Sequence, residues 1–531
     1  MTSRPSILVL AALAAGMIGA SPAAAQSQNT LTIVREVDSD RYDPHRQTAR
    51  ATAEVMFMLA DTLVSLDHDM RTIRPGIAES WTVSADGKVY TFKLRQDVQF
   101  CDGKKMTAED VVYSLKRWID PATRSPVRWR AGPVEDIVAT DPYTVEYRLS
   151  APYGELLPQL TLATAVIVDK ANVEALGADF GIRGFNGTGP YCWVDWRPRN
   201  ELRLRRHDAY RWGPPIYENR GPAQIQEVIW KIVPEENTRL AATLTGQSQV
   251  TQYIPYSGLS QIRANRNLRV VNNDIAFWTI FFGFKTDKPG VDDPVVRRAM
   301  VMAVDQEAIS RDINFGETEP AYSYLHRSTP DWNAALEPNL IRTNIAEANR
   351  LLDQAGWVRG ADGVRAKNGV RLSPLIYGFA GSTFQQLTEA VQGDLRKIGV
   401  DLRIQLFDAT AAWGKLATQE FDLFTMGYPY LTTGEAVNFF FRSTNVPTPN
   451  RMNWKNPETD RLLSLGMHAL NPADRATAYG EVLRQVHEAA VWIPLYHEPM
   501  RIAASNRLAE FKAHNIYGCG LYKGLDLRFI R

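Results

Sequence analysis

The chain has 531 residues, of which 45% are hydrophobic and 22% charged; this is an ordinary globular composition on a chain too long for a single core. Its 60 basic and 59 acidic residues give a net charge of +1, which provides no electrostatic reason to expect nucleic acid or an anionic membrane as partner. The 13 Trp and 20 Tyr are suited either to filling a large core or to lining a pocket for an amphipathic ligand.

The N-terminal residues have the pattern of a secretory signal. Arg4 supplies a positive charge, residues 7–15 form an apolar run too short to span a membrane, and an Ala-x-Ala pattern ends at Ala25. A buried N-terminal helix is the alternative interpretation. No Cys stands at the expected cleavage point, so we expect no lipid anchor. We therefore predict a signal peptide at 1–25 and an exported mature chain that is free to diffuse.

The first third of the mature chain contains clear strand and helix patterns. Residues 89–94 alternate between apolar and polar side chains, which predicts a half-buried strand. Thr107 is a good helix N-cap and is followed three residues later by Asp110, so a helix is expected to begin there. Residues 144–149 alternate again and predict a second strand.

A glycine-rich segment, Gly187–Gly189, has the look of a phosphate-binding loop. A phosphate loop of the Walker type needs Lys-Ser or Lys-Thr and a helix start after its last glycine, whereas Pro190-Tyr191 follows here. Residues 191–196 and 201–206 both read as strands, with a turn at 197–200 between them. The segment is therefore predicted to be a bend that enters a β-hairpin.

The second half of the chain alternates between helices and strands. Asn344 is an N-cap with Glu347 at the third helical position, and Gly356 ends that helix. Helices that lead into strands through short glycine stops predict a layered α/β domain. The expected elements are a helix over 344–356, a helix over 384–398, a strand over 400–406, a helix that begins at 471 and a strand over 490–496.

The sequence carries no catalytic or metal-binding motif at a recognisable spacing, and no cofactor is expected. A secreted hydrolase stays open as an alternative, because catalytic triads are defined by geometry rather than by sequence order. A metal-chelate or haem carrier that uses His497 is a further alternative, although a structural His is the commoner role. One pair among Cys101, Cys192 and Cys519 could be bridged in an oxidising compartment, and the sequence does not select the pair.

Five stretches occur in an order that is highly specific. They are "DRYDPHRQT" (Asp40–Thr48), "IAESWTVSADGKVYTFKLRQDVQFCDGKKMTAEDVVYSLKR" (Ile77–Arg117), "GTGPYCWVDW" (Gly187–Trp196), "VDDPVVRRAMVMAVDQEAI" (Val291–Ile309) and "IPLYHEP" (Ile493–Pro499). Together they resemble the family 5 solute-binding proteins of bacterial ABC importers, which bind peptides, nickel or oligosaccharides.

This resemblance implies an α/β, two-lobed periplasmic-binding-protein-like fold of the class II (cluster C) type, with an extra domain inserted in lobe I. It implies a monomer without enzymatic activity that captures a small polar organic solute by lobe closure and delivers it to the transmembrane subunits of an ABC permease. The implied solute is a short or modified peptide, an opine-like conjugate or an oligosaccharide. The implied division is lobe I at 26–70, 185–275 and 493–531, the extra domain at 71–184 and lobe II at 276–492.

The resemblance also implies where the solute is contacted. The expected contacts come from an early loop, from the strand that enters lobe II, from a lobe II helix and from a loop after "FDLFTMG". A place in the core is the alternative for Trp278 and for Trp413. The expected ligand-binding residues are Asp38, Ser39, Asp40, Phe277, Trp278, Trp413, Tyr428, Tyr430, Thr432 and Glu435.

The lobe II loop departs from the pattern of the peptide binders. Those proteins place an Asp in this loop, where it pairs with the α-ammonium of the peptide. The matching position here is Leu431 or Thr432, and neither side chain balances a buried ammonium. Glu435 substitutes for that Asp only if the loop folds back. The departure argues against an ordinary free-amine peptide and leaves sugars, opine-like conjugates and modified peptides open.

Overall fold

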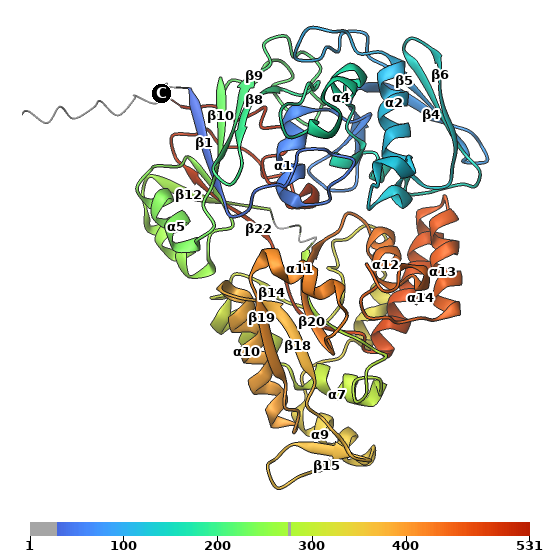
Figure 1. Cartoon of the computed structure of the whole chain (residues 1–531), viewed down its shortest axis with the longest axis vertical. Coiled ribbons are helices and arrows are strands. Elements are labelled where there is room, and N and C mark those ends of the chain that lie inside the picture. The colour runs from blue at the N-terminus through green and yellow to red at the C-terminus, as the bar shows by residue number, and fades with distance from the viewer. Residues whose placement is uncertain (1–28, 274, 276–277, 531) are drawn as a thin grey trace, which may run out of the picture.

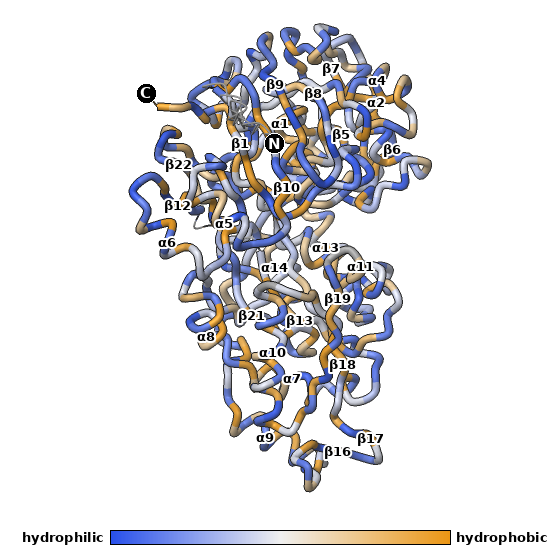
Figure 2. The backbone as a smooth tube through the Cα atoms, turned by 60° about the vertical axis from the view of Figure 1, so that its left-hand side comes forward, coloured by the Kyte–Doolittle hydropathy of each residue, from blue (hydrophilic) through white to orange (hydrophobic). Residues whose placement is uncertain are grey.

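Two lobes, each built on its own β-sheet, make up the protein (Figure 1). The computed structural model describes residues 29–273, 275 and 278–530, so the predicted signal peptide and Phe277 lie outside the described residues. Hydrophobic segments run mainly through the strands at the centre of each lobe, and the loops at the rims are mostly hydrophilic (Figure 2). No helix in the described part of the chain is both long and apolar enough to cross a membrane.

Lobe I, in the upper part of Figure 1, is built on a seven-stranded sheet. Its central strand β1 pairs in parallel with a neighbour on each side, and all six of its residues are buried. Helix α1 (Arg50–Leu59) buries nine of its ten residues. The strand order is β12 (Leu268–Asn273), β22 (Met500–Ser505), β11 (Val250–Gln252), β1 (Thr30–Arg35), β10 (Glu227–Ile232), β9 (Glu201–Arg206) and β8 (Tyr191–Arg197).

A four-stranded antiparallel sheet forms the domain inserted in lobe I. Both strands predicted in this region are confirmed, at the bounds expected. The side chains of Thr107 and Asp110 form a reciprocal N-terminal cap, which confirms the predicted helix start. The strand order is β4 (Ala78–Val83), β5 (Val89–Leu94), β7 (Thr144–Leu149) and β6 (Val134–Asp141), and the domain includes helices α2 (Ala108–Ile119) and α4 (Lys170–Leu176).

The glycine-rich bend leads into the predicted hairpin of β8 and β9. The Gly189 N–H donates to the Leu59 carbonyl oxygen at the end of α1, at 2.9 Å. A Cβ atom on Gly187 or on Gly189 would collide with carbonyl oxygens of that helix end, at Leu59 and Met58 respectively. The two glycines therefore let the backbone approach α1 closely, which is a packing role.

A disulfide between Cys101 and Cys192 joins the inserted domain to β8, and Cys519 is a buried free thiol. The pairing that the sequence left open is thereby settled. Cys101 lies in the turn after β5, whereas Cys192 lies in a strand of the lobe I sheet. The bond ties the inserted domain to the lobe on which it sits.

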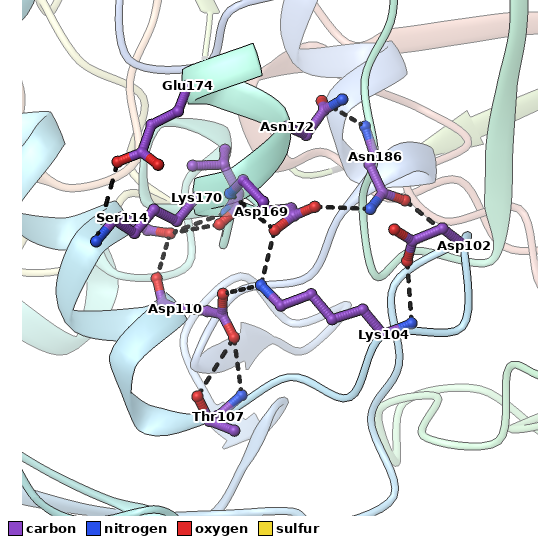
Figure 3. A network of polar contacts seen from close by, with 12 residues as sticks. Asp102, Lys104, Thr107, Asp110, Ser114, Asp169, Lys170, Asn172, Glu174 and Asn186 are labelled. Atoms are coloured by element: carbon purple, nitrogen blue, oxygen red, sulfur yellow. Dashed lines mark hydrogen bonds and ion pairs between the residues drawn. The ribbon is translucent and has the colours of Figure 1, made fainter. Parts of the chain in front are cut away.

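A polar network reinforces the same junction (Figure 3). The Lys104 ammonium donates to Asp110 at 2.6 Å and to Asp169 at 2.7 Å, and both carboxylates are almost fully buried. Asn186, just before the glycine bend, donates to the second oxygen of Asp169 at 2.9 Å. Because every buried charge in this group has a partner, the network stabilises the junction between the inserted domain and the hairpin.

Lobe II, in the lower part of Figure 1, is built on a six-stranded mixed sheet. Its strand order is β14 (Glu319–Pro320), β21 (Trp492–His497), β13 (Trp278–Phe284), β20 (Leu423–Pro429), β18 (Leu375–Phe379) and β19 (Arg403–Phe407). Its main helices are α7 (Pro294–Ala303), α9 (Ile345–Gln354), α10 (Ser382–Lys397), α11 (Ala409–Ala417), α12 (Thr433–Phe441), α13 (Pro457–His468) and α14 (Pro472–Glu488).

The helices and strands predicted in lobe II are confirmed, with shifts of two or three residues at some ends. The strand predicted from residue 400 begins at Arg403. The reason is local, because the Val400 N–H bonds to the Leu395 carbonyl at the end of α10 and the Asp401 N–H bonds to the Leu372 carbonyl. These residues are held by helix-end and loop contacts before the ladder of the sheet starts.

The chain passes between the lobes twice, in neighbouring places. It leaves the lobe I sheet at Asn273 and joins the lobe II sheet at Trp278. It returns between His497, the last residue of β21, and Met500, the first of β22. The expected return at residue 493 falls inside β21, which pairs with β13 as far as His497. The sheets therefore place this crossing later than expected, and the full set of domain limits stays a prediction.

Candidate functional site

A cavity of about 180 Å³ lies where the two lobes meet, beside the crossing strands. Lobe I supplies Arg50, Arg239 and Tyr253 to its wall, and lobe II supplies Trp278 and Phe384. A second cavity of about 360 Å³ shares four wall residues with it. A solute between the lobes would therefore touch both of them, as a closing mechanism requires.

Trp278 is one of the residues that line this interlobe cavity. Its indole packs against the backbone of Gly427, where a Cβ atom would lie only 2.6 Å from the indole nitrogen. The Arg50 guanidinium lies 5.3 Å from the Trp278 ring and 3.2 Å from the Tyr253 ring. The sequence analysis allowed either a core position or a place in the pocket wall for Trp278. Its side chain borders the cavity. Contact between Trp278 and a solute stays a prediction.

An ion pair between Arg130 and Glu435 connects the inserted domain to lobe II. Their side chains are 2% and 0% exposed, and the same guanidinium nitrogen donates to the Tyr428 hydroxyl at 3.0 Å. Glu435 lies in the first turn of α12, and its other oxygen accepts from the Leu431 N–H at 2.6 Å. The loop thus folds back as considered above, but Arg130 already neutralises the carboxylate.

The sequence-based prediction did not include Arg130. It lies in a short 3₁₀ turn, Arg128–Ala131, which also contains the exposed Arg128, and the sequence pattern does not distinguish the two arginines. Its Nε has no hydrogen-bond partner among the described residues, and the guanidinium also lies 5.6 Å from the Tyr517 ring. Local sequence gives no signal for its role, since its partner Glu435 is 305 residues away.

Glu155 is a second buried acid at the contact between the inserted domain and lobe II. Burial, with a further contribution from Asp331, raises the pKa of its carboxyl to about 8, because desolvation penalises the charged form. Gly434 lies so close that a Cβ atom there would overlap the Glu155 carboxylate. This acid is therefore protonated at neutral pH while the lobes are in contact.

The side chains of Asp38 and Ser39, in the early loop of lobe I, form hydrogen bonds with other residues of the protein. One Asp38 oxygen accepts from Tyr42, and the other accepts from the Trp196 indole at 3.0 Å. The Ser39 hydroxyl donates to the Arg41 carbonyl and lies 2.6 Å from the Thr52 hydroxyl. Asp40 is exposed. None of the three lines the interlobe cavity among the described residues, and their expected contact with a solute remains untested.

The remaining expected residues of lobe II occupy different environments. Tyr430 is 2% exposed, and its hydroxyl accepts from the His326 N–H at 2.8 Å and lies 3.0 Å from the Thr279 hydroxyl. Thr432 is the N-cap of α12. Tyr428 is half-buried and stacks on Phe439. Phe277 and the side chain of Trp413 lie outside the described residues.

The metal-carrier alternative gains nothing from His497. This side chain is 3% exposed, its Nδ1 lies 3.1 Å from the Thr279 hydroxyl, and burial lowers its pKa to about 3. Within the described ranges, the one cluster with metal-ligand geometry is Cys101, Cys192 and His207, and its two sulfur atoms form the disulfide.

Comparison with known proteins agrees with this architecture. Residues 72–447 match the model of the bacterial extracellular solute-binding proteins, family 5 Middle. The glutathione-binding protein GsiB of Salmonella paratyphi A is 28% identical over 518 residues, which cover 94% of this chain and 95% of that protein.

Solved structures show the same fold. NikZ from Campylobacter jejuni, in complex with Ni(L-His), matches with a TM-score of 0.83 and 22% identity, over 94% of this chain and 99% of that chain. MoaA from A. tumefaciens R10, in complex with mannopinic acid, matches with a TM-score of 0.82 and 20% identity over the same shares. This chain belongs to the family 5 bacterial extracellular solute-binding proteins.

Proposed function

We propose that this protein is the periplasmic solute-binding component of an ABC importer. It captures a small polar organic solute between its two lobes and delivers it to the transmembrane subunits of a permease, without chemical conversion. The observation that carries this proposal is the cavity whose wall combines Arg50 and Tyr253 of lobe I with Trp278 and Phe384 of lobe II. A solute that contacts both lobes favours the closed state by its differential affinity.

The site favours modified or conjugated solutes over ordinary peptides with a free α-ammonium. In the lobe II loop, Leu431 and Thr432 stand where the peptide binders have their Asp. Glu435, the nearest acid of the loop, is paired with Arg130 and is fully buried. A ligand ammonium at this place would have to displace an arginine. Opine-type conjugates such as mannopinic acid are the class to test first. Glutathione is the second, because its free α-ammonium lies on a γ-linked glutamate and not at the start of an ordinary peptide backbone.

Thermal unfolding of the mature protein with a panel of solutes tests the proposal. The panel contains glutathione, mannopinic acid, dialanine and maltotriose, each at millimolar concentration. A bound solute raises the midpoint, because it binds the folded protein and not the unfolded chain; saturation at 100 times Kd contributes about 2.7 kcal/mol. Calorimetry with a one-to-one stoichiometry and no loss of solute over hours is the expected companion result.

Two results would count against the proposal. Absence of any midpoint shift across the panel, extended to nickel-histidine and haem, would remove the binding role. Release of products from ester, peptide or glycoside substrates would instead favour the secreted hydrolase. Metal analysis of protein purified without added ligand separates the metal-carrier alternative, which predicts a metal content near one per chain.

A further inference from the structure

The wall of the interlobe cavity contains three arginines, and three glutamates, Glu36, Glu236 and Glu498, line it as well. The Arg50 guanidinium lies 3.0 Å from Glu36, and the Arg239 guanidinium lies 3.5 Å from the same carboxylate. The Arg501 guanidinium lies 2.9 Å from Glu498. These pairs hold the three guanidinium groups in place around the cavity.

The polar atoms that lack partners at this wall are all of one kind. Within the described part of the chain, the buried side-chain atoms of the cavity wall without a hydrogen-bond partner include the Nε atoms of Arg239 and Arg501, the Nη1 of Arg501 and the indole Nε1 of Trp278, whereas the Nε of Arg50 lies 3.4 Å from Glu54 in an ion pair. Each of these atoms is an N–H donor and none is an acceptor. Buried donors are normally satisfied, so this set indicates a ligand group that accepts hydrogen bonds.

Arg501 is the best placed of the three arginines. Its side chain is 5% exposed, and its guanidinium carbon lies over the Tyr256 ring, 3.8 Å from the ring centre, so the guanidinium packs against that ring. One nitrogen donates to Glu498, which leaves Nε and Nη1 without acceptors. Burial opposes the charge, but Tyr256 and Glu498 outweigh it and raise the pKa of Arg501, so the group is cationic at every pH of interest.

The size of the cavity limits what its donors can receive. A volume of about 180 Å³ holds a carboxylate and a few attached atoms, but not a whole conjugate or trisaccharide. The second cavity adjoins it and shares Tyr256 and Thr383 with it. A neutral sugar hydroxyl would satisfy one donor, whereas a carboxylate offers acceptor sites for several donors and balances charge.

We propose that the interlobe cavity is a carboxylate subsite, with Arg501 and the indole N–H of Trp278 as its hydrogen-bond donors and Arg50 and Arg239 as its supporting cations. This inference rests on the proposed function and narrows its solute class to organic acids and acidic conjugates. Neutral oligosaccharides then fall outside the solute class, and the acid group of the solute is the part that contacts both lobes.

Succinate tests the subsite without knowledge of the natural solute. The unfolding midpoint is measured in 0–50 mM sodium succinate, with sodium chloride used to keep the ionic strength constant. We expect a rise for the natural protein, at least tenfold weaker apparent affinity for Arg501→Met and partial recovery for Arg501→Lys. Arg484→Met, which removes an exposed lobe II arginine, is the matched control and should respond as the natural protein does.

Trp278→Phe gives a second measurement if Arg501→Met fails to fold. It keeps an aromatic ring in the cavity wall but removes the N–H donor, so we expect a several-fold loss of succinate affinity. The inference is overturned if succinate has no effect beyond that of chloride on the natural protein. It is also overturned if the folded Arg501→Met variant responds as fully as the control, or, where that variant does not fold, if Trp278→Phe does.

Esterified solutes distinguish this inference from the proposed function. Glutathione should bind at least tenfold more tightly than its diethyl ester, which lacks both negative charges. If glutathione and the ester bind equally well, the carboxylate subsite is wrong while solute binding stands. If none of the solutes in the panel binds but the succinate response depends on Arg501, the subsite stands and the proposed capture of a transported solute is wrong.

Discussion

Arg130 of the inserted domain donates a hydrogen bond to Glu435 of lobe II, and neither side chain is more than 2% exposed. This ion pair is therefore made only while the lobes are in contact. Opening the lobes would return both charges to water, which regains their hydration and gives up their attraction. The pair thus fixes the register of closure without adding much net stability to the closed state.

Removal of Arg130 alone should be strongly destabilising. Arg130→Met leaves the Glu435 carboxylate buried without its cation, and breaking a buried pair in this way costs about 3–5 kcal/mol. We expect a lower urea midpoint, or lobes that stay apart and bury less surface. Equilibrium urea unfolding measures the first outcome and small-angle X-ray scattering the second.

The double variant Arg130→Met/Glu435→Leu tests whether the unpaired Glu435 charge causes the loss of stability in Arg130→Met. It removes both charges and should recover most of the loss, because two apolar groups of similar size replace the pair. Arg484→Met, which breaks an exposed pair with Glu481, should change stability by less than about 1 kcal/mol. A loss in the double variant as large as in Arg130→Met would show that the charge pair is not the cause.

The secondary structure was predictable because its signals are local. The period-two alternation at 89–94 and the caps at Thr107, Asn344 and Asn471 involve residues that are neighbours in sequence, and each matches the structure. The disulfide could not be assigned, because the choice among three cysteines depends on a distance between Cys101 and Cys192, 91 residues apart.

The site was much less predictable, because its contacts join distant residues. Asp38 was expected to bind solute from its place in a loop, yet its oxygens accept from Tyr42 and from Trp196, which is 158 residues away. Nothing in the sequence marks Arg130 or Arg501, whose roles depend on partners that only the fold brings close. A polar residue reveals its function only when its hydrogen-bond partners are known.

Glu155 should make lobe contact depend on pH. In contact its carboxyl has a pKa of about 8, against 4.5 when free, so the contact is favoured in acid and weakens as the pH rises from 4.5 to 8. The contribution of Glu155 to the free energy of lobe contact changes by at most about 1.4 kcal/mol per pH unit. Solute affinity, which depends on lobe contact, should be greater at pH 5 than at pH 8; thermal stability is a poorer readout, because buried histidines such as His497, with a pKa of about 3, disfavour the folded state in acid.

Glu155→Gln tests this assignment, because the amide has the same shape and does not titrate. The groups that face Glu155 are Asp331 and Arg475, with Glu435 and Tyr479 nearby, and they remain in the variant. We expect a flatter pH profile between 4.5 and 8. The exposed acid variant Glu337→Gln should keep the natural profile, and an unchanged slope in Glu155→Gln would assign the pH dependence to another group.

Tyr430 should behave as a core residue of lobe II. Tyr430→Phe leaves the buried His326 N–H without its acceptor, which costs about 1–3 kcal/mol, and Tyr430→Ala adds a cavity for a total of about 3–5 kcal/mol. Solute affinity of the folded Phe variant should be unchanged. Urea unfolding and calorimetry together decide the matter, since weaker binding at full stability would place Tyr430 in the pocket.

Reduction of the Cys101–Cys192 disulfide should loosen the inserted domain. The bond closes a loop of about 90 residues, and loss of such a bond typically costs 2–5 kcal/mol. We expect dithiothreitol to lower the unfolding midpoint, and Cys101→Ser/Cys192→Ser to show the same midpoint with and without reductant. Hydrogen exchange should rise around the junction, at residues 99–105 and in β8, rather than in lobe II.

The third cysteine provides the control for this experiment. Cys519 is a buried free thiol in lobe I, so Cys519→Ala should keep the full response to dithiothreitol. The polar network of Lys104, Asp110 and Asp169 holds the same junction without sulfur, so reduction should weaken the domain contact without abolishing it. If reductant lowers the midpoint of the double serine variant as much as that of the natural protein, the effect does not come from this disulfide.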